Sequence, residues 1–386
     1  MAKVKKSFAE INARIRKKEA VVVTAEELIG RVRENGVEKT AQEVDVITTG
    51  TFGPMCGSGA LLNFGHTTPK IKAQKVWLNN VEAHAGIAAV DIFLGATQLI
   101  DDDPGNKIYP GKFEYGGGHV ISDLLMGKSV TLIAKSYGTD CYPRKEFAKE
   151  YKLTDFPDAW LWNPRNCYQN YNVAVNSTDK TVYTYMGVLK PKFGNANYCS
   201  AGQLSPLLCD PYYRTIGLGT KIFLGGTQGW VLGAGTQHNP KVPRTIDGIP
   251  RGGAGTISVR GNLKDMSHQF VRGVSFTGYG VSLAVGIGIP IPVLDEEIVK
   301  FASLGDDKLM APVIDYGADY PNGINRVLTE ISYGQLKSGK IILNDQEIIT
   351  SPLSSYPGAL KIAKTLKEWI KSGEFTLGEP QDRLPS

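Results

Sequence analysis

Glycine occupies 44 of the 386 positions of this chain, against a usual share of about 7%. The glycines follow no Gly-X-Y period, which excludes a collagen-like fibre. They gather most densely over residues 217–288, between short β-branched runs. Glycine in such a setting supplies tight turns and close approaches between backbones. We therefore expect residues 217–288 to form a mostly β layer with glycine turns.

The first fifty residues alternate between helix and strand signals. Ser7 with Glu10, and Thr24 with Glu27, match the capping box that opens a helix. Compact apolar runs at residues 20–23 and 44–49 are typical of buried strands. The same reasoning predicts strands over residues 76–78 and 130–134, helices over residues 119–126 and 356–373, and a hairpin near residues 182–188.

This order of elements favours an α/β or α+β fold, in which an N-terminal layered α/β part precedes the glycine-rich β part. We expect residues 1–210 to form the first part and to carry both candidate catalytic cysteines. Residues 211–373 would hold the β part and the C-terminal helix, and residues 374–386 a tail; a single catalytic domain is the alternative. Residues 156–209, rich in Asn, Tyr and Pro, predict long structured loops of the kind that often carry function.

Composition removes several classes of function. A net charge of +5 over this length gives no polybasic footprint for nucleic acid or a membrane surface. The longest apolar run, residues 281–294, is interrupted by Gly and Pro and is shorter than the roughly 20 residues of a membrane span. Residues 1–18 are basic but lack the apolar segment of a secretory signal. Five scattered cysteines then indicate free thiols in a reducing, cytoplasmic compartment.

The familiar nucleotide and metal motifs are incomplete. Five Gly-x-Gly pairs begin a dinucleotide fingerprint, but each lacks the third glycine. Gly127-Lys128-Ser129 ends like a phosphate loop, yet Ser122 stands where its first glycine is needed. No Cys-x-x-Cys pair occurs, and no two histidines have the i, i+4 spacing of a metal site. We therefore expect no metal site and no cofactor bound by this chain.

Two cysteines stand apart by their context. Cys56 lies in Gly-Pro-Met-Cys-Gly-Ser-Gly, directly after a predicted strand, where flanking glycines let backbone N–H groups point at one spot and favour a thiolate. Cys141 also follows a predicted strand and precedes a predicted helix opened by Pro143, with Arg144 and Lys145 adding positive charge. Both would then lie at strand-to-helix turns, where α/β folds place their chemistry. Simple packing is the alternative for each.

The remaining cysteines have no such context. Free cysteines usually behave as small buried hydrophobic residues. We therefore expect Cys167, Cys199 and Cys209 to serve packing.

Beyond these local patterns, long unusual strings occur along nearly the whole chain, at residues 50–60, 116–119, 138–143, 194–198, 235–239, 278–280 and 286–292. In these strings the chain resembles the homocysteine-biosynthesis family of anaerobic archaea and bacteria. The resemblance implies an L-aspartate semialdehyde sulfurtransferase that makes L-homocysteine for methionine biosynthesis. Its two functional cysteines would correspond to Cys56 and Cys141. The resemblance also implies a separate ferredoxin-like iron–sulfur protein as the source of electrons.

The implied reaction turns an aldehyde carbon into a thiol, using L-aspartate semialdehyde, a sulfide-level sulfur donor and two electrons. We expect one of Cys56 and Cys141, by preference Cys141, to hold sulfur as a persulfide and the other to resolve the sulfur–sulfur bond as a disulfide. His119 and His238 are the candidate general acids, with a structural hydrogen bond as the alternative for each.

Candidate ligands for the substrate's charged groups come from arginine and asparagine. A carboxylate calls for a guanidinium or an N–H nest, and the amino-acid end could be held by side-chain amides. The candidates for substrate binding are Arg144, Arg251, Arg272, Asn195 and Asn197.

Two other classes of protein stay open, together with the oligomeric state, including a homo-oligomer. One is a nicotinamide-dependent semialdehyde oxidoreductase with a cysteine nucleophile, against which the incomplete fingerprints count. The other is a non-catalytic sulfur carrier whose cysteines only relay sulfur to a partner.

Overall fold

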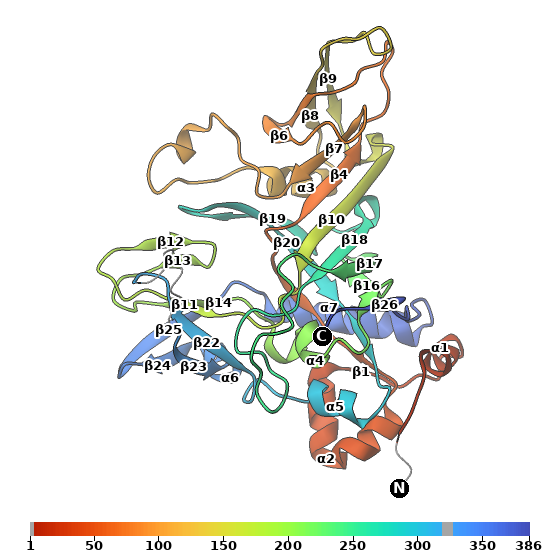
Figure 1. Cartoon of the computed structure of the whole chain (residues 1–386), viewed down its shortest axis with the longest axis vertical. Helices are drawn as coiled ribbons and strands as arrows, with labels where there is room; N and C mark the ends of the chain where they lie inside the picture. Colours follow the sequence, from red (N-terminus) through yellow and green to blue (C-terminus); the bar gives the residue numbers. More distant parts are fainter. Residues whose placement is uncertain (1–3, 319–326) are drawn as a thin grey trace.

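The computed structural model describes residues 4–318 and 327–386, and it has a mixed α/β fold (Figure 1). The expected fold class is confirmed. In the described part, helices lie against sheets formed by strands from distant parts of the chain. The helices are α1 (Phe8–Arg16), α2 (Ala25–Glu43), α3 (Gly117–Leu125), α4 (Pro206–Cys209), α5 (Glu296–Ala302), α6 (Tyr333–Lys337) and α7 (Tyr356–Lys371).

The N-terminal layer confirms the capping boxes. The side chain of Ser7 accepts a hydrogen bond from the backbone N–H of Glu10, and Thr24 accepts one from that of Glu27. These bonds satisfy N–H groups that the first turn of a helix leaves free. A three-stranded sheet lies beside α2, with β1 parallel to β2 and β2 antiparallel to β21. Its strands are β1 (Val22–Thr24), β2 (Val46–Thr48) and β21 (Pro290–Pro292).

A nine-stranded sheet forms the middle of the molecule. Its order is β19-β20-β16-β17-β18-β10-β4-β7, and β3 pairs with β20. Both α3 and α7 pack against β20, and all nine residues of that strand are buried. This burial accounts for the mostly apolar sequence of β20. The strands are β3 (Thr51–Pro54), β4 (Gly59–Asn63), β7 (Asp91–Gly95), β10 (Asp158–Asn166), β16 (Lys221–Leu224), β17 (Thr227–Ala234), β18 (Ile257–Asn262), β19 (Val271–Phe276) and β20 (Gly280–Gly288).

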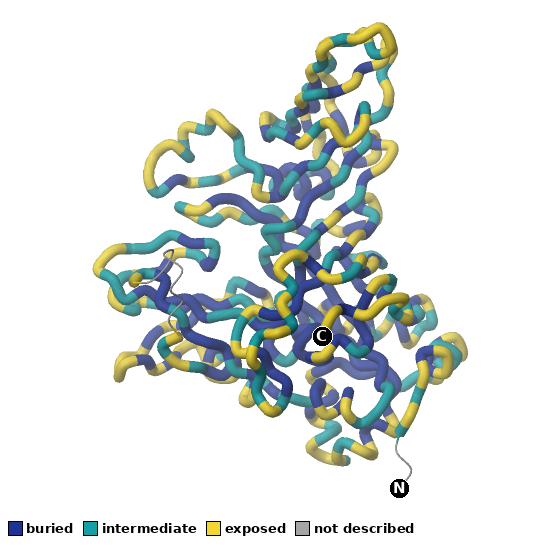
Figure 2. Tube along the Cα trace, in the orientation of Figure 1, coloured by how far each residue is buried: buried dark blue, intermediate teal, exposed yellow. Residues whose placement is uncertain are grey.

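A smaller four-stranded sheet, in the order β6-β5-β8-β9, stands at one end of the long axis of the molecule (Figure 1). We refer to these four strands and their connecting turns as the arm. The backbone at the far end of the arm is largely exposed (Figure 2). The arm consists of β5 (Lys75–Leu78), β6 (Val81–Ala83), β8 (Val130–Lys135) and β9 (Glu146–Tyr151).

A six-stranded sheet, in the order β23-β22-β11-β14-β25-β24, forms the other flank. Two short antiparallel pairs complete the described sheets, β12 with β13 and β15 with β26. The flanking strands are β11 (Val173–Val175), β14 (Ala196–Tyr198), β22 (Met310–Asp315), β23 (Val327–Ser332), β24 (Lys340–Leu343) and β25 (Gln346–Pro352). The short pairs are β12 (Val182–Thr184) with β13 (Gly187–Leu189), and β15 (Gly217–Leu218) with β26 (Asp382–Arg383).

The structure corrects three local expectations. Residues 156–209 are not mainly loops, because β10, β11 and β14 lie among them. The helix expected after Cys141 is absent from this described segment: the chain turns and enters β9, which pairs with β8 over six residue pairs. Cys56 is likewise followed by a strand, β4. In each case pairing with distant or neighbouring strands overrides the local signal.

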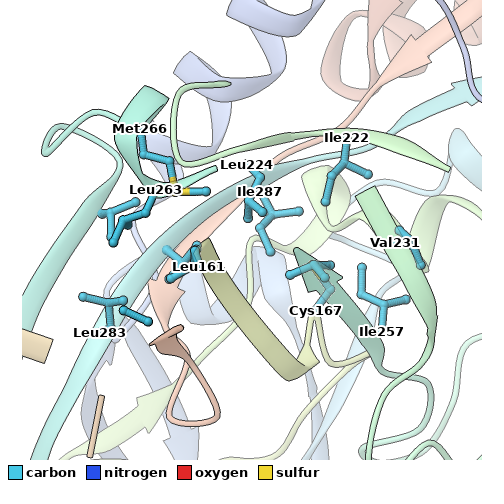
Figure 3. Close-up of a cluster of buried hydrophobic side chains, with 14 of the residues drawn as sticks. Leu161, Cys167, Ile222, Leu224, Val231, Ile257, Leu263, Met266, Leu283 and Ile287 are labelled. Atoms are coloured by element: carbon cyan, nitrogen blue, oxygen red, sulfur yellow. The ribbon is translucent and has the colours of Figure 1, made fainter. Parts of the chain in front are cut away.

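The largest buried cluster lies between the nine-stranded sheet and the elements that cover it. Figure 3 shows Leu161 of β10, Leu283 and Ile287 of β20 and Ile257 of β18 converging, with Cys167 among them. Burial of such side chains removes apolar surface from water and is the main stabilising term of the fold. The sheet is thereby held as a rigid support for the loops at its edge.

The division of the chain into parts stays a prediction, although strands from both sides of residue 210 share the nine-stranded sheet. The tail expected over residues 374–386 packs on the body, where β26 pairs with β15 and Leu384 is buried. None of the described helices has the length and apolar character needed to cross a bilayer.

Candidate active site

A cavity of about 330 Å³ opens where β3, the end of β10, the β12–β13 turn and the segments after β14 and β25 meet. Cavities that bind small molecules are usually concave, with apolar walls and a few convergent polar groups. This one has such walls. It is lined by Thr51, Pro54, Met55, Cys56, Gly57, Arg165, Cys167, Tyr168, Tyr171, Tyr185, Met186, Cys199, Ser200, Ser205, Pro206, Gln237, Tyr279, Leu353 and Ser354.

Cys56 lies in this cavity at the end of β3, and its side chain is half-buried. The pairing of β3 with β20 continues through Met55, whose N–H bonds to the carbonyl of Leu283 at 2.8 Å. The next residue of β20, Ser282, donates its hydroxyl to the Cys56 sulfur at 3.5 Å. A hydroxyl donor stabilises the thiolate form of a cysteine, which is the nucleophilic form.

The residue after Cys56, Gly57, must be small because the backbone there packs against β10. A Cβ on this residue would lie 3.1 Å from Oδ1 of Asn163 and 3.4 Å from the carbonyl oxygen of Arg165. The loop that carries Cys56 therefore packs closely on the end of β10. The glycine-rich context noted in the sequence serves this close approach.

Three cysteines line the cavity: Cys56, Cys167 and Cys199. All three are free thiols, and in the described part of the chain no group of three acidic, histidine or cysteine residues could hold a metal ion. Cys167 is only 4% exposed and belongs to the core, where burial raises the pKa of its thiol. Cys199 is half-buried: it packs against a buried cluster that includes Met186 and Leu189, as expected, and it also lines the cavity wall. Cys209 is buried outside the cavity, as expected, and its pKa is raised to about 12.

Arg165 brings the one positive charge. Among the described residues that line the cavity, it alone has a charged side chain. No carboxylate of residues 4–318 or 327–386 forms an ion pair with its guanidinium. The residue lies where the register of β10 against β18 shifts, between Asn163 and Asn166. Such bulges commonly redirect a side chain toward an active site.

Tyrosines form much of the remaining wall. The rings of Tyr168 and Tyr171 lie 5.1 Å apart, and the hydroxyl of Tyr168 donates to Oε1 of Gln237 at 2.8 Å. Burial raises the pKa of Tyr168, Arg165 lowers it and the nearby Cys56 raises it. Tyr168 is therefore a protonated hydroxyl close to both the thiol and the guanidinium.

Cys141 and Arg144 lie elsewhere, on the turn between β8 and β9 in the arm. Cys141 is exposed, within a turn closed by hydrogen bonds between Thr139 and Tyr142. Arg144 donates to the carbonyl of Thr68 at 2.8 Å. Neither lines the cavity, and Figure 1 shows β8 and β9 well apart from β14, the strand before Cys199. The structure therefore does not bring Cys141 to Cys56 within one chain, and its catalytic role stays a prediction.

The two predicted general acids also lie outside the cavity lining. His119 begins α3, its Nε2 is 3.2 Å from the hydroxyl of Ser275, and burial lowers its pKa. His238 contacts the backbone of Thr256 through Nδ1 and the carbonyl of Pro385 through Nε2 at 2.8 Å. With both ring nitrogens bonded to backbone, His238 has the structural role given as its alternative.

The remaining predicted ligands do not line the cavity either. Arg251 pairs with Glu330 on the surface, and the exposed Arg272 bonds to the carbonyl of His268. Asn195 and Asn197 bond to the backbone of the β12–β13 hairpin, where Asn197 holds the carbonyl of Met186 at 2.7 Å. The two asparagines thus support a turn of the cavity wall without reaching the cavity themselves.

Three residues that line the cavity were not among the candidates chosen from the sequence: Arg165, Tyr168 and Cys199. The signal available for the first two was the Asn- and Tyr-rich segment after residue 156, which was expected to be functional without any residue being chosen. Cys199 has no local signal, because its partners come from β3 and from the segment after β25.

The comparisons with known proteins agree with the resemblance. Residues 20–377 match the family described as "Homocysteine biosynthesis enzyme, sulfur-incorporation". The chain is 49% identical to an L-aspartate semialdehyde sulfurtransferase of Methanosarcina acetivorans, over 99% of this chain and 72% of the relative. It is 46% identical to the enzyme of the same name from Methanocaldococcus jannaschii, over 99% of this chain and 74% of the relative. No solved structure matched.

These matches cover almost the whole chain, including the loop that carries Cys56. The protein therefore belongs to the homocysteine-biosynthesis family of sulfur-incorporating enzymes.

Proposed function

We propose that this protein is an L-aspartate semialdehyde sulfurtransferase, which forms L-homocysteine in the cavity around Cys56. The observation that carries the proposal is the presence of the half-buried thiol of Cys56 and the guanidinium of Arg165 in one cavity, where no other described lining residue is charged and no described carboxylate pairs with Arg165. The names of two relatives of nearly half-identical sequence support the same substrate.

The cavity suits a short amino acid that carries an aldehyde. Arg165 can hold the carboxylate through paired N–H donors, which is the strongest arrangement for this group. The ammonium group has no carboxylate to meet among the described lining residues, but the faces of Tyr168 and Tyr171 attract a cation. The aldehyde carbon is then directed to the Cys56 sulfur.

The chemistry begins with sulfur held on Cys56 as a persulfide, whose outer sulfur adds to the aldehyde carbon. The aldehyde oxygen gains negative charge in this step and needs a hydrogen-bond donor or acid. Tyr168, with its raised pKa, keeps its proton at neutral pH and takes the role that the sequence had assigned to His119 or His238. A second thiolate then attacks the Cys56 sulfur, which breaks the sulfur–sulfur bond, leaves a disulfide and releases the adduct as a thiolate. Loss of water from this adduct gives a thioaldehyde, and two electrons with two protons reduce it to the thiol.

Cys141 acts in a different step from Cys56, because it lies outside the cavity. Its thiol is exposed at the end of the arm, where a large sulfur donor can reach it. We assign it the first acceptance of sulfur, before transfer to Cys56. That transfer requires movement of the arm, or the arm of a second copy in a homo-oligomer. Electrons come from a separate iron–sulfur protein, since the chain is not expected to bind a cofactor.

The test is product formation by the purified protein. Supplied with L-aspartate semialdehyde, sulfide or polysulfide and a low-potential reductant, the protein should form homocysteine. Persulfide on the protein without homocysteine would identify a sulfur carrier instead. Reduction of the aldehyde with NAD(P)H, together with NAD(P)H binding in a titration, would identify an oxidoreductase. Cys209→Ser, which changes a buried cysteine outside the cavity, is the matched control for every cysteine variant.

A further inference from the structure

The cavity holds a second reachable thiol that the sequence treated as packing. Cys199 follows β14, and its sulfur lies 3.3 Å from the hydroxyl of Ser354. Ser354 in turn packs on β3, because a Cβ on Gly53 would lie 2.9 Å from its Oγ. Gly53 is three residues before Cys56, and both Cys199 and Cys56 line the same cavity.

Cys56 also affects the pKa of the Cys199 thiol. Burial raises the pKa of Cys199, the bond with Ser354 lowers it, and the nearness of Cys56 raises it again. A thiol with a raised pKa is less ionised at neutral pH but is intrinsically more nucleophilic once ionised. Cys56, with its hydroxyl donor from Ser282, is suited to carry sulfur, while Cys199 is suited to attack later.

The geometry points to Cys199 as the thiol that releases sulfur from Cys56 by forming a Cys56–Cys199 disulfide. This inference rests on the proposed function. In the first step, Cys56 takes a sulfane sulfur from a persulfide or polysulfide, and the rest of the donor leaves as a thiolate. The outer sulfur of Cys56–S–S⁻ then adds to the aldehyde carbon to give Cys56–S–S–CH(OH)R.

The Cys199 thiolate next attacks the sulfur of Cys56. One S–S bond breaks and another forms, so the product sulfur leaves with the electron pair as ⁻S–CH(OH)R and the two cysteines become a disulfide. Sulfide can then open this disulfide at Cys56, giving the Cys56 persulfide and the Cys199 thiolate for the next turnover. The only electrons consumed are the two that reduce the thioaldehyde, which the low-potential reductant supplies.

Cys167 is a poorer candidate although it lines the same cavity. It is 4% exposed and packs among Leu161, Ile257 and other core side chains (Figure 3). An attack by its sulfur would require the core to open. Cys141 does not line the cavity at all.

The experiment maps disulfides in the full chain after two treatments. In the first, protein is titrated with diamide, a two-electron thiol oxidant, without substrate. In the second, protein loaded with polysulfide is mixed with L-aspartate semialdehyde without reductant. Free thiols are then alkylated and peptides are identified by mass spectrometry. The variants are Cys199→Ser, Cys141→Ala and the control Cys209→Ser.

We expect a Cys56–Cys199 disulfide after both treatments in wild type, Cys141→Ala and Cys209→Ser. Cys199→Ser should load sulfur on Cys56 and then stall, with homocysteine formation lower by about 10²-fold or more. A disulfide from Cys56 to Cys141 or Cys167, or product formation by Cys199→Ser within twofold of Cys209→Ser, would overturn the inference. If wild type forms the Cys56–Cys199 disulfide with diamide but never makes homocysteine, the thiol pair stands and the proposed function fails.

Discussion

The hydroxyl of Ser282 donates a hydrogen bond to the sulfur of Cys56 across 3.5 Å, from the buried strand β20 to the end of β3. Helix α3 packs against β20 at Ser282 and so holds this pair in place. At Gly118, in the first turn of α3, a Cβ would collide with the carbonyl oxygen of Ser282, so only glycine permits this contact. The glycine in the first turn of α3 thus allows the close packing that holds Ser282 beside the thiol.

Replacing this donor should make Cys56 less reactive. We expect Ser282→Ala to lower the rate of Cys56 alkylation by iodoacetamide at pH 7 by about tenfold or more, because a hydrogen bond to a charged group is worth roughly 1.5–3 kcal/mol. Peptide mapping with labelled iodoacetamide measures the rate at Cys56 separately from the exposed Cys141. An unchanged rate at Cys56 would show that Ser282 does not act on the thiolate.

Arg165 should govern substrate binding. Arg165→Gln removes the charge while keeping an amide donor, and we expect kcat/KM for L-aspartate semialdehyde to fall about 10- to 100-fold, mostly through KM. Arg165→Lys should recover only part of this loss, because lysine cannot pair both carboxylate oxygens in the same way. Arg272→Gln, an exposed arginine outside the cavity lining, is the control. Equal kinetics for Arg165→Gln and Arg272→Gln would remove Arg165 from the site.

Tyr168 should affect the chemical step more than binding. Tyr168→Phe is expected to lower kcat about 10²-fold with little change in KM, as for loss of a general acid. Because burial raises the pKa of Tyr168 above the usual value of about 10, the hydroxyl stays protonated through neutral pH. The pH profile of kcat should therefore show no loss of this acid below about pH 10. A fall of kcat between pH 7 and 9 that disappears in Tyr168→Phe would contradict this assignment.

The proposed role of Cys141 in accepting sulfur can be tested by measuring sulfur loading separately from sulfur transfer to the aldehyde. Cys141→Ala should lose multiple turnovers with a protein-bound persulfide donor. It should retain a single turnover when Cys56 has been loaded chemically with polysulfide, because Cys141 is not in the cavity. Rapid quenching with homocysteine quantification measures both. Loss of the single turnover as well would place Cys141 in the transfer step itself.

Local sequence signals predicted the elements that have local causes. The capping boxes at Ser7 and Thr24 and the strand expected over residues 44–49 depend on residues within a few positions, and the structure confirms them. The loop around Cys56 was selected for the same reason, since its glycines lie within a few residues of the cysteine. The fold class followed from the order of these elements.

The rest of the site depends on contacts between distant residues. Cys199 reaches the cavity only because β14 pairs with β25, and the segment after β25 returns Ser354 to β3. Arg165 points there because of a register shift in β10, which no local pattern announces. The helix expected after Cys141 failed because β9 pairs with β8. Sequence context selected Cys56, which lines the cavity, but could not identify the other residues of the lining.

Isotope transfer tests most directly whether a persulfide on Cys56 delivers its outer sulfur to the aldehyde. Protein loaded with ³⁴S-polysulfide is freed of excess donor and mixed with L-aspartate semialdehyde and reductant, and the ³⁴S content of homocysteine and of the Cys56 peptide is measured. We expect label to leave the Cys56 peptide and appear in homocysteine in equal amount for wild type and Cys209→Ser, and no labelled product for Cys56→Ser. Labelled homocysteine from Cys56→Ser at the wild-type rate would contradict the account.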